Sequence, residues 1–423
     1  MENMDDLETE FMDVPDSLTN IPTNSYPLVT TFYKFLMMLD GTLRDPYFER
    51  FCDARHLLYA QTRGSRSVAL QSFIRKNEVN YDRFSSSYWP HFNAQLTKRL
   101  DCYRVFTEII SHIKGDPRSI DAGDGKLSKQ AYVLLSEGRT SSLSRVEREI
   151  IYDIFQSYEK MKMNNREFDL GDFVMDLHRR LRSQGYEGDK MDFIYIDEVQ
   201  DLSMTQIALF SYVCRNVEEG FVFSGDTAQT IARGIDFRFQ DIRSLFYKKF
   251  VQPNIISGGC ERKDKGCISE IFCLSQNFRT HSGVLNLSQS VIDLLYHFFP
   301  QSLDILKPET SLIAGESPVL LECGNNENAI KLIFGNRSSV GSSSMEGFGA
   351  EQVILVRDES AQKEILNIVG KKALVLTIVE CKGLEFQVKN FFYVLLLDDQ
   401  MRFLLTYLKS CSALTILVSY MYL

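Results

Sequence analysis

Two acidic side chains stand where a short apolar run ends. Asp197 and Glu198 follow directly on Phe193–Ile196. A carboxylate in such a place can hold Mg2+ directly or through water, and the metal neutralises phosphate charge during phosphoryl transfer. A second carboxylate beside it can orient the attacking water or accept its proton. The pair therefore predicts a metal ligand, Asp197, and a general base, Glu198.

A second apolar run is followed by a similar group of polar residues. Phe221–Phe223 leads into Gly225 and Asp226, and Gln229 lies three residues further on. An amide side chain at this place can lie near a terminal phosphate and report whether that phosphate is present. We therefore take Gln229 as a candidate catalytic residue and Asp226 as a candidate nucleotide-binding residue.

The elements that must position these groups form the pattern strand, helix, strand. Continuous apolar runs such as Phe193–Ile196 and Phe221–Phe223 are typical of strands buried on both faces of a parallel sheet. Between them, Ser203–Cys214 has a capping serine and apolar residues at helical spacing. In open α/β sheets, ligands bind at the carboxyl ends of the strands, where Asp197 and Asp226 fall. The sequence therefore predicts an α/β protein.

The two motifs, IDEVQD at 196–201 and SGDTAQ at 224–229, resemble motifs II and III of the UvrD/Rep-like superfamily 1 helicases. They are closer still to the UvrD-like ATP-binding module of large, plant-type TPR and ankyrin repeat-containing proteins. The resemblance implies RecA-like domains of the P-loop NTPase type, with parallel sheets, flanking helices and a helical insertion. It also implies ATP and Mg2+ as cofactors and single-stranded nucleic acid, DNA or RNA, as partner.

Three further segments carry the resemblance. Residues 26–33 match motif Ib, in which Thr31 and Phe32 would contact nucleic acid; we expect a strand here that runs into a helix at Lys34–Asp40. Residues 271–281 resemble motif IV and open the second RecA-like domain. Its Arg279 would reach the γ-phosphate, where a guanidinium stabilises charge in the transition state, unless it is only a structural arginine.

The third segment resembles motif V. It follows expected strands at 352–357 and 373–378, and Thr377, Lys382, Gly383 and Glu385 match its pattern. In the family this segment contacts both the nucleotide and the nucleic acid, so Gly383 and Glu385 are candidate nucleotide-binding residues. The remaining candidates for contact with nucleic acid are Lys382, Thr227 and His281.

Two features depart from the family. The sequence contains no Gly-x-x-x-x-Gly-Lys-Ser/Thr, the loop that cradles phosphates. After Gln387 it fits poorly, and motif VI with its second arginine is missing. We therefore expect a helicase module truncated at both ends, with weak or no ATP hydrolysis of its own. Missing helicase segments or protein partners would have to complete it.

The resemblance divides the chain as follows. The expected parts are an acidic lead (1–24), a partial first RecA-like domain (25–41 and 165–258), a helical insertion (42–164), a partial second RecA-like domain (268–387) and a divergent tail (388–423).

Two basic and aromatic segments leave alternatives open. Residues 88–92 hold a tyrosine, a tryptophan and a phenylalanine near several Lys and Arg, which is either a stacking platform for single strands or the core of a small helical subdomain. Residues 233–250 either contact a phosphate backbone or form a solvated amphipathic face.

Composition limits both the way the protein can bind nucleic acid and its expected location in the cell. The net charge of −9 argues against binding nucleic acid by bulk electrostatics but leaves room for a local basic groove. The nine cysteines include no CxxC pair, which suits reduced thiols inside a cell. We see no signal peptide, and the apolar segment 403–423 is interrupted by Lys, Ser and Thr. A soluble protein of the nucleus or cytoplasm, with no membrane partner, is expected.

Three functions remain. The first is a helicase or translocase module that couples ATP hydrolysis to single-stranded nucleic acid. The second is a non-catalytic nucleic-acid-binding or regulatory remnant of the same fold. The third is a metal-dependent nuclease built on the acidic cluster, whose activity would survive the removal of ATP.

Overall fold

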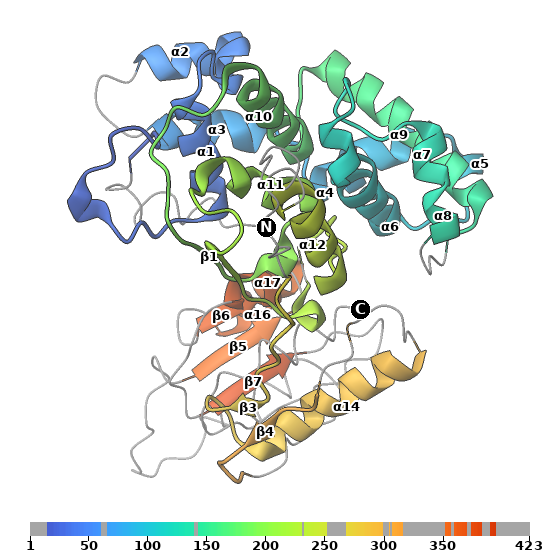
Figure 1. Ribbon diagram of the computed structural model, residues 1–423. Coiled ribbons are helices and arrows are strands. Elements are labelled where there is room, and N and C mark those ends of the chain that lie inside the picture. The colour runs from blue at the N-terminus through green and yellow to red at the C-terminus, as the bar shows by residue number, and fades with distance from the viewer. Residues whose placement is uncertain are drawn as a thin grey trace. The chain divides into compact units, whose positions relative to one another are not determined.

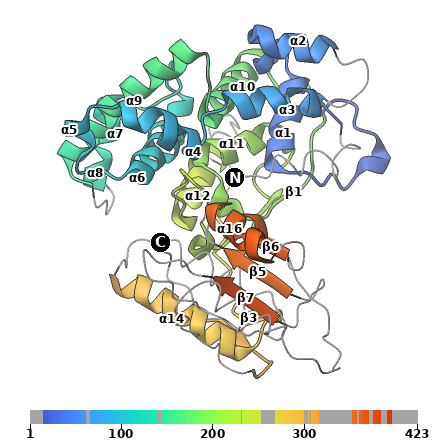
Figure 2. The same cartoon turned by 180° about the vertical axis from the view of Figure 1, so that it is seen from behind.

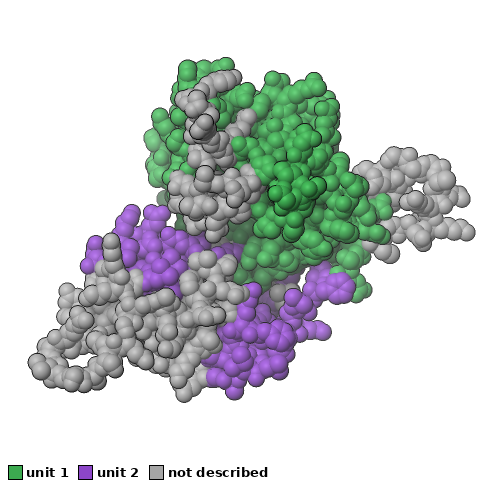
Figure 3. All heavy atoms as spheres, turned by 90° about the vertical axis from the view of Figure 1, so that its left-hand side faces the viewer, with its two compact units in different colours: residues 1–270 green, residues 271–423 purple. Residues whose placement is uncertain are grey.

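The computed structural model describes eleven parts of the chain: residues 15–60, 66–138, 143–230, 232–251, 268–298, 304, 307–315, 352–356, 359–369, 374–382 and 390–394. They belong to two compact units, unit 1 (1–270) and unit 2 (271–423), which Figure 3 colours separately. The described residues are mostly helical with small parallel sheets, so the expected mixed α/β class is confirmed.

The described residues of unit 1 form helices and one short sheet (Figure 1). Its α-helices are α1 (Phe32–Thr42), α2 (Cys52–Ala60), α3 (Arg66–Asn77), α4 (Tyr81–Arg83), α5 (Ala94–Thr97), α6 (Cys102–Thr107), α7 (Lys129–Val133), α8 (Leu135–Gly138), α9 (Arg145–Asn165), α10 (Leu170–Gln184), α11 (Met204–Val213) and α12 (Phe239–Leu245). Its strands are β1 (Ile194–Ile196) and β2 (Phe221–Phe223). Within this unit, Figures 1 and 2 show α5 to α9 gathered on one side and α1, α2, α3 and α10 on the other.

Two hydrophobic cores lie inside unit 1. The first takes its buried side chains from 18–74, Ile120 and 168–250, and the second takes them from 79–158. Tyr88 and Phe92 are buried in the second core, and Trp89 packs against it. Of the two alternatives for residues 88–92, the structure thus favours the core of a helical subdomain.

The predicted strand–helix–strand unit is confirmed. β1 and β2 pair in parallel, with Tyr195 opposite Val222. Between them, α11 begins after Ser203, which forms a capping box with Gln206. The box satisfies backbone N–H groups that have no partner within the helix.

The expectation that both faces of these strands are buried is wrong for the described residues. Ile196 faces the first core, but Tyr195 is 74% exposed and Val222 is 51% exposed. Since side chains alternate along a strand, these two residues share the opposite face. The described part of unit 1 places no element over that face.

The strand expected at residues 26–33 is also wrong. This segment is irregular up to Thr31, whose side chain accepts a hydrogen bond from the backbone N–H of Lys34 and so begins α1 at Phe32. Pro27 offers no N–H to a ladder. The helix predicted at Lys34–Asp40 is present and extends further in both directions.

The described residues of unit 2 form two small parallel sheets. Its elements are β3 (Gln276–Asn277), α14 (Ser282–Phe298), β4 (Thr310–Ser311), β5 (Gln352–Val356), α16 (Glu359–Val369), β6 (Leu374–Thr377), α17 (Ile378–Cys381) and β7 (Asn390–Val394). β3 pairs with β4, and the second sheet has the order β6-β5-β7. The strands predicted at 352–357 and 373–378 are confirmed.

No helix in the described parts of the chain is both long and apolar enough to cross a membrane.

Candidate functional site

Asp197 and Ser224 lie side by side where β1 and β2 end. The backbone N–H of Ser224 donates to the carbonyl of Ile196 at 2.8 Å, and the N–H of Val199 donates to the carbonyl of Ser224 at 3.0 Å. These bonds hold the two strand ends together. The Ser224 hydroxyl then donates to Oδ1 of Asp197 at 2.7 Å. The carboxylate of Asp197 is thereby oriented while the residue stays exposed.

Glu198 adopts a left-handed backbone conformation, with φ 52°. Residues other than glycine seldom do so, and such strain clusters at functional sites. The conformation turns the chain from β1 into a short 3-10 helix, η8 (Val199–Asp201). Oδ1 of Asp197 accepts the N–H of Glu198 at 3.0 Å, which stabilises the turn.

Gln200 joins the two acidic motifs, a role that the sequence analysis missed. Its side chain is fully buried. Its Nε2 donates to Oε2 of Glu198, and its Oε1 accepts the backbone N–H of Asp226 at 3.0 Å. The sequence offered two signals for this contact, Gln200 as the fourth residue of DEVQ and the glycine at position 225. In the structure, a Cβ on Gly225 would lie 2.4 Å from Oε1 of Gln200.

Asp226 organises the second motif. Its Oδ1 accepts the N–H of Ala228 at 2.9 Å and so caps a 3-10 helix, η9 (Thr227–Gln229). Its Oδ2 accepts Nε2 of Gln229 at 2.9 Å. The structure thus brings four predicted residues of unit 1 into one connected group: Asp197, Glu198, Asp226 and Gln229.

The other candidates in unit 1 are Thr227, Thr31 and Phe32, and only Thr227 is buried. Thr227 is 4% exposed, and no hydrogen-bond partner is found for its hydroxyl among the described residues. Thr31 caps α1. Phe32 is half-buried, with its ring centroid 5.9 Å from that of Phe210. Phe32 therefore packs partly against α11.

The candidates of unit 2 lie at two element ends. Arg279 is exposed, and its N–H donates to Oδ1 of Asn277 at 2.8 Å. His281 is buried at the start of α14. Lys382 follows α17, which Thr377 caps. Gly383 and Glu385 lie outside the described residues.

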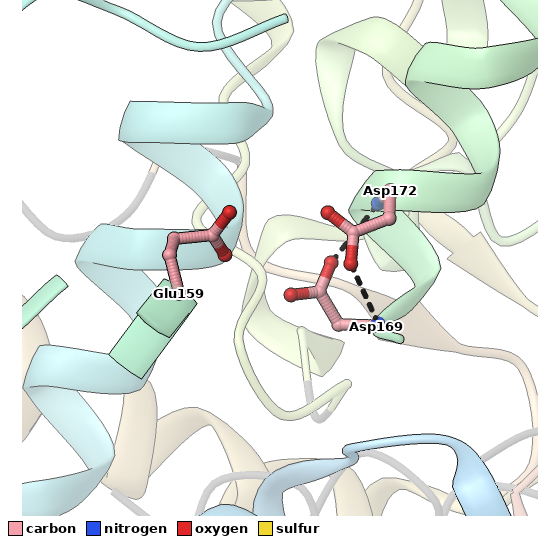
Figure 4. A group of neighbouring side chains, drawn as sticks. All are labelled: Glu159, Asp169 and Asp172. Atoms are coloured by element: carbon pink, nitrogen blue, oxygen red, sulfur yellow. Dashed lines mark hydrogen bonds between the residues drawn. The ribbon is translucent and has the colours of Figure 1, made fainter. Parts of the chain in front are cut away.

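A second acidic group of unit 1 has a different character. Figure 4 shows Glu159 of α9 facing Asp169 and Asp172 at the start of α10, with ligand atoms within 4.8 Å of one another. Nζ of Lys114 lies 2.6 to 2.8 Å from all three carboxylates, and Nζ of Lys162 lies 2.6 Å from Asp169. Two ammonium groups therefore occupy the place of a cation. This cluster is an ionic core, not a metal centre.

The pKa shifts in this cluster agree with that assignment. Burial alone would raise the pKa of Asp169, but the ammonium groups of Lys114 and Lys162 outweigh it and hold this pKa well below its usual range. Burial alone would lower the pKa of Lys114, but the carboxylates around it, Asp169 most of all, hold it well above its usual range. Asp169 and Lys114 are therefore both charged near neutral pH.

Comparison with known proteins defines the class of this domain. Residues 93–249 match the family model of the UvrD/REP helicase N-terminal domain. The match contains β1, α11, β2 and the acidic motifs. The match confirms the resemblance predicted from the motifs.

A curated relative extends the similarity over most of the chain. The chain is 32% identical over 411 residues to TPR and ankyrin repeat-containing protein 1 from Homo sapiens. The aligned region covers 89% of this chain but 14% of the relative. The chain therefore spans a small part of the length of this relative.

Proposed function

We propose that the chain carries part of a UvrD-like helicase or translocase module, which couples binding and hydrolysis of ATP to single-stranded nucleic acid. The observation that carries this proposal is the placement of Asp197, Glu198 and Asp226 beyond the carboxyl ends of two parallel strands. Ligands of open α/β sheets bind at this edge. The family of residues 93–249 supports the same activity.

Asp197 and Ser224 fit a magnesium-binding role. The carboxylate is exposed, and the hydroxyl beside it orients Oδ1. Carboxylate oxygens and water are ligands that Mg2+ prefers. When bound, Mg2+ neutralises charge on the phosphates of ATP.

Glu198 and Gln229 take the roles nearest the reaction. Gln200 donates an N–H to Glu198, so the Glu198 oxygen there is an acceptor. A carboxylate held in this way can orient a water molecule or take its proton. The amide of Gln229, held by Asp226, would sense the terminal phosphate. Asp226, Gly383 and Glu385 complete the proposed nucleotide-binding set.

The proposal assigns the remaining candidates by family resemblance. Arg279 would stabilise charge on the γ-phosphate. Thr31, Phe32, Thr227, His281 and Lys382 would contact nucleic acid. Because Thr227 and His281 are buried, any such contact by them requires their surroundings to rearrange.

A non-catalytic binding or regulatory module is the second candidate. The observation that favours it is the sequence itself, which lacks the Gly-x-x-x-x-Gly-Lys-Ser/Thr loop. Amide groups of that loop would otherwise hold the phosphates.

Hydrolysis of MgATP by the purified chain tests both candidates, with and without oligo(dT) or oligo(rU). A helicase module is expected to hydrolyse ATP faster with a single strand, and Glu198→Gln is expected to lower kcat by about 100-fold or more. The control is Glu218→Gln, which changes an exposed glutamate ahead of β2, at the opposite end of the strand. It should leave kcat unchanged.

Two results would decide against catalysis by this chain on its own. One is hydrolysis by Glu198→Gln at the wild-type rate. The other is binding of a fluorescent oligonucleotide by the wild-type chain, measured by anisotropy, with no hydrolysis at any concentration of MgATP. The second result is the one that a binding or regulatory module predicts.

A further inference from the structure

Gln200 is a buried amide whose side chain contacts both acidic motifs. We propose that Gln200 is a positioning residue that couples the carboxylate of Glu198 to the segment 225–229, and through it to the amide of Gln229. This proposal rests on the proposed function of the same site.

The orientation of the Gln200 amide follows from its neighbours. A backbone N–H can only donate, so the Gln200 atom that faces the N–H of Asp226 must be Oε1. The Nε2 group then faces Glu198, where it requires an acceptor. The usual ambiguity of amide orientation is therefore removed by the protein backbone.

Close packing fixes the amide in place. A Cβ on Gly225 would lie 2.4 Å from Oε1 of Gln200 and 3.0 Å from Cγ1 of Val199. Only glycine allows this approach. With its side chain fully buried, Gln200 has no alternative partner in water.

A continuous path of hydrogen bonds runs from the proposed base to the proposed phosphate sensor. Glu198 accepts from Gln200, Gln200 accepts from the N–H of Asp226, and Asp226 accepts from Nε2 of Gln229 at 2.9 Å. A movement of the Glu198 carboxylate should therefore displace the Gln229 amide. Direct contact of Gln200 with substrate is not part of this role.

Nuclear magnetic resonance of the full chain tests the path without any ligand. The chain is labelled with 15N at aspartate and glutamine, and Glu198→Ala is introduced in the wild type and in Gln200→Met. In the wild type, Glu198→Ala is expected to shift the backbone amide signal of Asp226 and the side-chain amide signal of Gln229. In Gln200→Met the same change should shift them several-fold less.

Two variants separate the path from simple stability. Gln206→Met removes another buried glutamine, which caps α11, and should destabilise the chain while leaving the response to Glu198→Ala intact. Gln200→Glu keeps an oxygen toward the N–H of Asp226 but loses the donor to Glu198. It should keep slow exchange of the Asp226 amide proton and lose the response. Equal responses in all backgrounds, or none in the wild type, would overturn the proposal.

Steady-state hydrolysis of MgATP then tests whether Gln200 contributes to catalysis. Gln200→Met is expected to lower kcat by roughly 10- to 100-fold, as loss of residues that orient catalytic groups does. KM for ATP should stay within about twofold, because Gln200 does not contact the nucleotide in this proposal. An unchanged kcat, or a rise in KM alone, contradicts it. Absence of wild-type hydrolysis would instead refute catalysis by this chain, and the magnetic resonance result would still decide the path.

Discussion

The Nζ atom of Lys114 lies 2.6 Å from Oδ2 of Asp169, and both side chains are almost completely buried. Lys114 ends a helical segment of the second core, whereas Asp169 caps α10, which packs in the first. The hydroxyl of Tyr158 on α9 also donates to Asp169, at 2.9 Å. The ionic core therefore joins the two hydrophobic cores of unit 1.

Replacing Lys114 should destabilise unit 1 strongly. In Lys114→Met, three carboxylates would keep only the ammonium of Lys162, and an uncompensated buried charge costs about 3–5 kcal/mol. Urea unfolding measures the free energy. The control is Lys129→Met, because Lys129 pairs with Asp153 at the surface and such pairs contribute about 1 kcal/mol or less. Equal losses in the two variants would contradict this account.

His178 should make stability depend on pH. It is buried, and its Nε2 lies 2.8 Å from the carbonyl oxygen of Thr205, to which it donates. Burial lowers the pKa of His178 from 6.5 to about 4. The unfolded chain therefore binds a proton more readily, so stability is full above pH 6.5 and falls as the pH drops toward 4. The loss should reach about 3 kcal/mol.

Unfolding in urea at a series of pH values checks the contribution of His178. His178→Gln should lose less stability than the wild type between pH 7 and pH 4, because the glutamine does not titrate. The control His91→Gln changes an exposed histidine and should follow the wild type. If His178→Gln shows the full wild-type dependence, the titrating group lies elsewhere.

Local patterns explain what the sequence could predict. The apolar runs before Asp197 and Ser224, with the capping Ser203 between them, were enough to place β1, α11 and β2. Each signal spans a few residues and depends on local side-chain polarity and capping. The same kind of signal failed at residues 26–33, where apolar and β-branched residues suggest a strand that has no partner in the described sheet of unit 1.

The parts that could not be predicted depend on distant segments. Gln200 meets the N–H of Asp226 across 26 positions, through the register of β1 and β2. Lys114 meets Asp169 across 55 positions. Sequence spacing carries no information on such contacts, so the acidic motif was predicted and the amide that organises it was not.

Gly225 should tolerate no side chain. In Gly225→Ala the new Cβ would displace the amide of Gln200 and break both of its hydrogen bonds. Leaving buried polar groups unpaired costs about 1–3 kcal/mol. The control Gly123→Ala places its Cβ where no atom lies within 4 Å, and its effect should stay within about 0.5 kcal/mol. Thermal and urea unfolding compare the two, and similar stabilities would show that the Gln200 amide is not tightly held.

The aromatic residues 88–92 should contribute to stability and not to binding of single strands. Phe92 is buried, with its ring centroid 5.9 Å from that of Phe84 in the second core. Phe92→Ala should therefore lower the free energy of unfolding in urea by about 3–5 kcal/mol.

A stacking platform at residues 88–92 would instead predict weaker binding of single strands, because each lost base contact weakens binding by about 1–3 kcal/mol. Anisotropy with labelled oligo(dT), at a temperature where the variant is folded, should give the wild-type result. The matched comparison in this binding assay is Tyr247→Ala, which removes an exposed ring from the basic segment 233–250. If Phe92→Ala weakens binding while stability is unchanged, residues 88–92 form a platform for nucleic acid and not a core.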